Sequence, residues 1–212
     1  TGVGNGLGAG DDTANDSNIG IGIASGTISA NGGNIGLTGT ANGLNNDNAG
    51  VILFNETDAN ATRVTTTSGN VTITGIGSFN ATGEFNNGVV IEGRGNLVST
   101  ATGGITISGY GGAYNNGTSS DNNQGVLIIG KANTAGDAVT VSVTGAGKAI
   151  VITGLGGGDG SSSNSGVDAT YARITSSSAT AGISITGFAV TAPPRCTPCL
   201  EAAQWLGAPQ KD

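Results

Sequence analysis

Few residues of this 212-residue chain have side chains suited to catalysis or metal binding. There is no histidine, and 7 basic residues stand against 14 acidic ones, for a formal net charge of −7. Without histidine, Ser-His and Cys-His catalysis and most zinc sites are excluded. The few, scattered basic residues disfavour binding to nucleic acid phosphates, and no run of 18 apolar residues offers a membrane span. We therefore expect no enzyme activity, no catalytic residue, no metal, no cofactor and no nucleic-acid partner.

Both cysteines lie in a C-terminal tail of different composition. After Val190 the chain reads Pro193-Pro194, then Cys196-Thr-Pro-Cys199, then an apolar segment from Leu200 to Leu206 that ends at a glycine. Cys-x-Pro-Cys before a helix resembles the redox motif of thioredoxin and glutaredoxin, but too few residues follow Cys199 to build that fold. Cys196 and Cys199 are instead expected to form a local disulfide in an oxidising compartment, or to stay reduced. Residues 200–206 are predicted to form a short helix.

The rest of the chain repeats one short phrase, in which two aliphatic residues are separated by one residue, small or hydroxyl-bearing in four of the five copies, with a glycine two positions later. The closing glycines are 36, 34, 45 and 33 residues apart. Near-periodic strand signals at this spacing predict a solenoid with one coil per repeat. The five copies are Ile35–Gly39, Val71–Gly75, Ile105–Gly109, Ile150–Gly154 and Ile183–Gly187.

Two further strand signals precede each copy of the phrase. One follows an Asn-rich stretch, as in Gly50–Phe54 and Gly88–Glu92, and a middle one is typified by Arg63–Thr65. The sequence thus predicts an all-β fold, a parallel β-helix of about five coils with three short strands each and with glycine or asparagine at the corners. We expect a polar segment over residues 1–18, the solenoid over 19–190, and the tail over 191–212.

The repeated phrases carry a resemblance to a known group of proteins. Gly88–Ile91 and Ile105–Gly109 are similar to the repeats of secreted bacterial β-helix proteins of the filamentous-haemagglutinin and autotransporter-passenger type. The resemblance implies a right-handed solenoid, exposed at the cell surface or secreted, that serves in adhesion or as a stalk or fibre.

Alternation of side chains along a strand places two kinds of residue on the outside. Aliphatic residues of the first strands are expected to form an exposed apolar patch, which monomers usually avoid, so the patch indicates an interface. These residues are Ile52, Phe54, Val90, Leu127 and Ile129. The third strands place hydroxyl residues outward, and this Thr-x-Thr array resembles the face of ice-binding proteins. Its members are Thr38, Thr72, Thr74, Thr106, Ser108, Thr153, Ser184 and Thr186, with Gly36 and Val151 as interruptions.

Two outward carboxylates are candidates for a catalytic pair. Glu92 and Asp168 are expected on one sheet face, two coils or about 10 Å apart, a separation that a glycosidase would tolerate. The surrounding outward positions are mostly Thr, Ser, Gly or aliphatic, so this activity is disfavoured.

The tail and the loops supply the remaining candidates. Leu200, Trp205 and Leu206 are expected to cap the last coil near Ile183 and Ile185, to cover the apolar patch, or to reach a neighbouring subunit. Sequons in loops would accept glycans in a cell that glycosylates; they are Asn55, Asn60, Asn80 and Asn116.

The function predicted from the sequence is an extracellular or cell-surface structural and adhesive solenoid. Its expected partners are further copies of itself, stacked end to end into a fibre, or other surface proteins and glycans. The alternative is an ice-binding protein that uses the outward Thr/Ser ladder.

Overall fold

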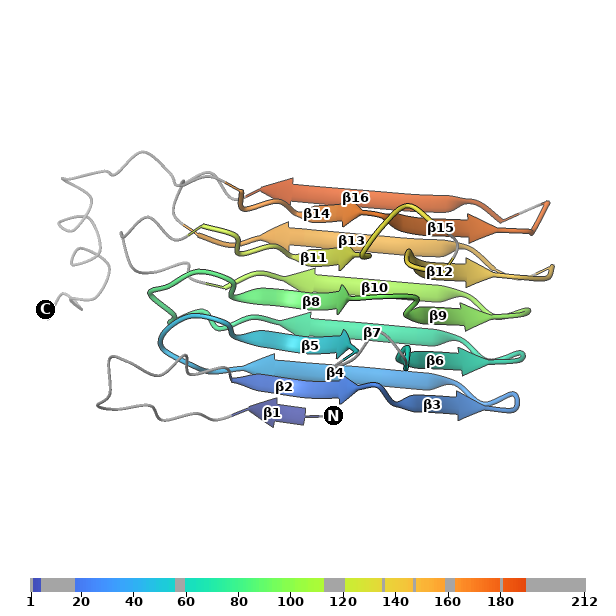
Figure 1. Ribbon diagram of the computed structural model, residues 1–212, viewed down its shortest axis with the longest axis horizontal. Helices are drawn as coiled ribbons and strands as arrows, with labels where there is room; N and C mark the ends of the chain where they lie inside the picture. The colour runs from blue at the N-terminus through green and yellow to red at the C-terminus, as the bar shows by residue number, and fades with distance from the viewer. Residues whose placement is uncertain are drawn as a thin grey trace, which may run out of the picture.

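The computed structural model describes residues 2–4, 18–55, 60–112, 121–134, 136–146, 148–158, 163–179 and 181–189. Within these residues every regular element is a β-strand, and the strands stack into successive coils of one parallel β-helix (Figure 1). The predicted fold of about five coils with three strands each is confirmed. The predicted helix over 200–206 lies outside the described residues. No helix long and apolar enough to span a membrane occurs in the described part of the chain.

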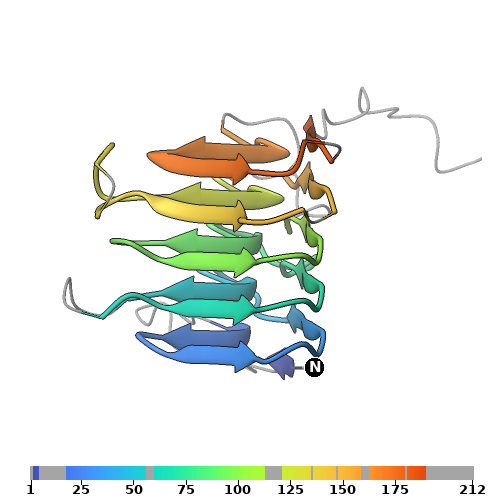
Figure 2. The same cartoon turned by 90° about the vertical axis from the view of Figure 1, so that its right-hand side faces the viewer.

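Each coil contributes one strand to each of three sheets, which we call B, C and A in the order the chain visits them, and the sheets form three flat walls of the stack (Figure 2). Sheet B contains β2 (Ile19–Ala24), β5 (Ala49–Phe54), β8 (Asn87–Glu92), β11 (Val126–Ile129) and β14 (Val167–Thr170). Sheet C contains β3 (Thr27–Ala30), β6 (Arg63–Thr66), β9 (Leu97–Thr100), β12 (Val139–Val143) and β15 (Ala172–Ser176). Sheet A contains β1 (Gly2–Gly4), β4 (Ile35–Ala41), β7 (Val71–Ile76), β10 (Ile105–Tyr110), β13 (Ile150–Gly156) and β16 (Ile183–Ala189).

The core consists of inward aliphatic side chains stacked coil on coil. Ile107 lies in register between Ile73 and Ile152, and all three are fully buried. Burying each such side chain contributes about 1.5–3 kcal/mol. Because one coil alone cannot enclose these side chains, the stack is the unit that folds.

The closing glycine of the repeated phrase does not form a corner, as the sequence had suggested. Gly75 pairs with Gly39 and Gly109, and β7 continues past it to Ile76. Its Cα faces inward, where a Cβ would stand 1.9 Å from the carbonyl oxygen of Gly88 at the start of the sheet B strand. The two backbones meet where sheets A and B converge, and only residues without a side chain fit there.

The corner that leads into sheet B contains a buried asparagine in each coil. The Asn86 amide N–H donates to Oδ1 of Asn123 at 2.8 Å, and the Asn123 N–H donates to Oδ1 of Asn164 at 2.9 Å. Below them, Nδ2 of Asn48 donates to Oδ1 of Asn86 at 2.5 Å, and Oδ1 of Asn48 accepts from the N–H of Asn18. The bend interrupts the regular strand pairing, and this asparagine ladder supplies hydrogen bonds to backbone groups that burial would otherwise leave unpaired.

A residue with a left-handed backbone conformation comes immediately before each of four ladder asparagines. The φ angles are 60° at Asp47, 60° at Phe85, 58° at Asn122 and 64° at Ser163. This conformation is ordinary for asparagine and aspartate but costs energy for a bulky side chain such as Phe85. The fold therefore holds Phe85 in an unfavourable conformation that turns the chain into β8.

Candidate functional site

The outward apolar residues of sheet B form a groove instead of a flat patch. Ile52, Val90 and Leu127 are in register in one column, and Ile129 lies in the next column beside Glu92. Val90 is only 4% exposed, and the other three are half-buried. These four residues line a groove of about 440 Å³, which we call the sheet B groove. Phe54, the fifth predicted interface residue, is half-buried in the column of Glu92 and is not among the residues that line the groove.

The two ends of the sheet B groove each contribute a carboxylate. Asp47 and Phe85 line it where β5 and β8 begin, and Glu92 lines it where β8 ends. Phe85 is 44% exposed, although its backbone is held in the left-handed region. Sequence reasoning missed Asp47 and Phe85 because they lie in the turns before the strands, and Glu92 was considered only as a member of a carboxylate pair. The signal was present, since both turn residues directly precede an Asn-x-Gly sequence.

Glu92 is a carboxylate in apolar surroundings. Burial raises its pKa above the ordinary 4.5, because a low-dielectric environment disfavours the charged form. Among the described residues, no lysine or arginine nitrogen lies within 4.0 Å of this carboxylate. Arg94, two residues along, instead forms a salt bridge with Asp137. A hydrogen bond from Thr134 and the charge of Arg94 hold the pKa of Asp137 below its ordinary value.

Glu92 and Asp168 share the outer face of sheet B, as expected, but they stand in different columns. Asp168 is in register with Leu127, whereas Glu92 is in register with Ile129. The Asp168 carboxylate accepts a hydrogen bond from the Thr170 hydroxyl at 3.2 Å. The two carboxylates are therefore offset both along the strand and along the stack.

The outer face of sheet A carries the Thr/Ser ladder in two columns. One column is unbroken, and its members are Thr38, Thr74, Ser108, Thr153 and Thr186. The other is interrupted, with Gly36, Thr72, Thr106, Val151 and Ser184 as members. A third column, not foreseen from the sequence, is apolar above Thr40. It contains Thr40, Ile76, Tyr110, Leu155 and Phe188, and Val3 of β1 is in register with Thr40. Tyr110 is 42% and Phe188 59% exposed, so this edge of the face is bulky and apolar.

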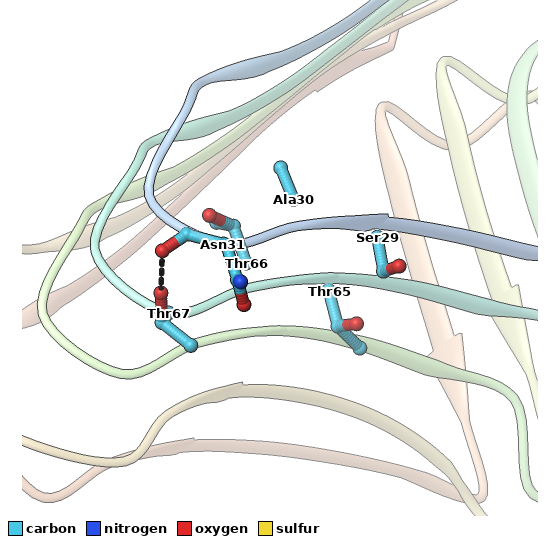
Figure 3. Close-up of a pocket in the computed structure, with 6 residues that line it drawn as sticks. All are labelled: Ser29, Ala30, Asn31, Thr65, Thr66 and Thr67. Carbon is cyan, nitrogen blue, oxygen red and sulfur yellow. Dashed lines mark hydrogen bonds between the residues drawn. The ribbon is translucent and has the colours of Figure 1, made fainter.

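A polar pocket of about 480 Å³ lies at β3, β6 and the turns that follow them (Figure 3). The Thr67 hydroxyl donates to the carbonyl oxygen of Asn31 at 2.5 Å, and the Thr66 hydroxyl donates to that of Gly33 at 3.0 Å. These hydroxyls tie one turn to the next. Ser29 and Thr65 project from neighbouring strands beside them (Figure 3). Serine, alanine, asparagine and threonine line the pocket, so it holds no group that titrates near neutral pH.

The last coil leaves part of the core column uncovered. Ile183 and Ile185 are 42% and 49% exposed, whereas Ile150 and Ile152, their partners one coil below, are fully buried. The inward side chains of β16 are therefore open on the side away from β13. The tail residues expected to cap this end, Leu200, Trp205 and Leu206, lie outside the described residues, as do Cys196 and Cys199.

Three of the four sequon asparagines lie among the described residues. Asn60 and Asn80 are exposed. Asn55 is half-buried, and its side-chain amide donates to the carbonyl oxygen of Arg94 at 3.3 Å. Asn55 is therefore a poorer glycan acceptor than its place in a loop had suggested. Asn116 lies outside the described residues.

The described residues form a parallel β-helix with two patterned faces and an exposed last coil. No family model, curated protein or solved structure matches it. Its function must therefore be inferred from these surfaces.

Proposed function

We propose that this β-helix is an extracellular structural or adhesive rod that lengthens by end-to-end stacking of further coils. The observation that carries the proposal is the open last coil, where β16 exposes Ile183 and Ile185 in a column that is otherwise sealed. Apolar side chains exposed beside a strand edge favour the addition of another coil. The constant register of all three sheets supports the same reading, since any added coil would meet the same pattern as the coil beneath it.

The proposal agrees with the composition of the outer faces. Sheet A presents hydroxyl columns and an apolar column at fixed spacing, which suits a repetitive contact surface. The expected partners are other copies of the chain and surface proteins or glycans.

The experiment is a measurement of assembly state by sedimentation velocity and electron microscopy. The wild-type chain is expected to form rods or filaments of solenoid width. Ile185→Glu should block them, because a charge would be placed on the stacking surface. Ser184→Glu is the matched control, since it adds the same charge one residue away on the outer face and should assemble normally. If the wild-type protein stays monomeric at high concentration, as the Ile185→Glu variant is expected to do, stacking is contradicted.

One observation favours ice binding as a second candidate. The column from Thr38 to Thr186 has a hydroxyl residue in every coil, at a repeat of about 4.8 Å. The bulky apolar column beside it, which includes Tyr110 and Phe188, makes this face less flat and places ice binding second. Thermal hysteresis that disappears in Thr74→Lys but persists in Thr65→Lys, on sheet C, would establish ice binding. A wild-type sample without hysteresis rules it out.

A further inference from the structure

The sheet B groove combines an apolar floor with a carboxylate at each end. Val90 and Leu127 form the floor, Asp47 lies at the end where β5 and β8 begin, and Glu92 lies at the other end. The strands β5, β8 and β11 that carry the floor lie one above another (Figure 1). An occupant that satisfies all three features needs two positive charges with an apolar stretch between them.

The strand geometry gives the length of the strand part of the groove, which begins two residues after Asp47 and ends at Glu92. Ala49 to Phe54 runs in register with Asn87 to Glu92, so the strand part of the groove spans five residue steps. At about 3.3 Å per residue this is about 16 Å. A saturated chain extends by about 1.2 Å per bond, by analogy with an extended backbone of three bonds per residue. About 13 bonds between the two nitrogens therefore match the strand part of the groove, and Asp47 lies in the turn next to one end of it.

From this geometry we infer that the sheet B groove binds a long-chain aliphatic diammonium ligand, with one ammonium at Asp47, the other at Glu92, and the methylene chain over Val90 and Leu127. The methylene chain suits this floor better than a peptide does. A peptide backbone would place N–H and C=O groups over aliphatic side chains that offer them no hydrogen bonds.

The charge balance of the region agrees with a cationic occupant. The chain has twice as many acidic as basic residues, and the nearest basic residue in sequence to Glu92, Arg94, is engaged with Asp137. Burial without a compensating cation raises the pKa of Glu92, and an ammonium beside the carboxylate would reverse that effect. This inference is independent of end-to-end stacking, because the groove lies on a side wall of the solenoid.

The test is calorimetric titration of the full chain with 1,12-diaminododecane, which has 13 bonds between its nitrogens. Spermine matches its length but carries two interior ammonium groups, which would lie over the apolar floor. We expect spermine, 1,6-diaminohexane and the dianion dodecanedioate all to bind more weakly. Equal binding of dodecanedioate would overturn the assignment of charge, and equal binding of spermine would overturn the assignment of the apolar floor.

Variants locate the site. Glu92→Gln and Asp47→Asn should each weaken binding of 1,12-diaminododecane about 3- to 10-fold, the effect of a partly exposed ion pair of about 1 kcal/mol. Asp168→Asn is the matched control, because Asp168 lies on the same face of sheet B but does not line the groove. Equal weakening by all three variants would indicate a general charge effect and overturn the site. A Lys-Ala-Ala-Ala-Lys peptide that binds where the diamine does not would overturn the ligand class.

Discussion

Gly75 in sheet A and Gly88 in sheet B bring their backbones together where the two sheets converge, since a Cβ on Gly75 would stand 1.9 Å from the Gly88 carbonyl oxygen. The same relationship recurs between Gly109 and Gly125. The glycines of the repeated phrase therefore fix how closely two walls of the solenoid approach each other.

Gly75→Ala should destabilise the fold by about 3 kcal/mol or more, because the obstructing atoms belong to the backbone and cannot turn away. The matched control is Gly36→Ala in β4, where nothing lies within 4 Å of the added Cβ. That change should be neutral or stabilise the protein by about 0.4–1 kcal/mol by restricting the unfolded chain. Urea unfolding of the two variants measures the difference. Equal effects would show that the close approach of sheets A and B is not required.

Asn86→Ala should cost about 1–3 kcal/mol. Its side chain accepts a hydrogen bond from Asn48 and donates to the carbonyl oxygen of Gly83 at 2.6 Å, so its removal leaves buried polar groups unpaired. Asn133→Ala, at an exposed turn position, is the control and should change stability little. Thermal unfolding followed by circular dichroism measures both variants, and a loss no larger than that of Asn133→Ala argues against a stabilising ladder.

Ile107→Asp should prevent folding, because it removes a fully buried side chain and leaves an unpaired charge in the centre of the stack. The expected loss is about 5 kcal/mol or more, comparable to the total stability of many domains. Thr106→Asp, one residue away and exposed, should fold normally. The far-ultraviolet circular dichroism spectrum separates the outcomes. A folded Ile107→Asp protein would mean that the strand faces are assigned the wrong way round.

Glu92 should make stability fall as pH rises. Its folded-state pKa is raised, so the folded protein holds the proton more tightly than the unfolded chain does. Stability from this group is complete below the unfolded pKa near 4.5 and is lost as pH rises through the folded pKa. Phe54 and Ile129 flank Glu92 in its column, Asp47 lies at the far end of the groove, and Arg94 faces Asp137, so no described cation offsets the effect.

The Glu92→Gln protein should therefore be more stable than the wild type at pH 7.5 and equal to it at pH 3.5, as measured by urea unfolding at both values. Asp137→Asn provides a control of opposite sign. The pKa of Asp137 is lowered, first by the Thr134 hydroxyl, so this group stabilises the fold at neutral pH and loses its effect as pH falls through its folded pKa. A Glu92→Gln protein less stable than the wild type at pH 7.5 would contradict the placement of Glu92.

The fold could be predicted from the sequence because its signals are local. The alternation at Ile105 and Ile107 and the return of the glycines report strand faces and coil length directly. The role of Gly75 could not be predicted, because the residue that obstructs a side chain there belongs to a different sheet. The outward direction of Ile52, Val90 and Leu127 followed from alternation as well. The groove did not, because its ends are built by turn residues whose position depends on the neighbouring coil.

The asparagine ladder could be predicted only in part. Every ladder asparagine precedes a glycine by two positions, so Asn-x-Gly before a strand was a visible signal. In a chain this rich in asparagine, the pattern does not say which side chains turn inward. Which asparagine side chains turn inward depends on which corners are buried, and this burial is a property of the stack as a whole.

The register of the strands shows that the spacing of coils along the stack does not depend on the number of residues in a coil. The phrases ending at Gly109 and Gly154 are 45 residues apart, whereas those ending at Gly154 and Gly187 are 33 apart, yet both pairs are immediate neighbours in sheet A. The register between neighbouring strands is the same in both cases, although the number of residues between the phrases differs. The solenoid is thus a molecular ruler with graduations of about 4.8 Å, and its spacing does not depend on the number of residues between neighbouring phrases.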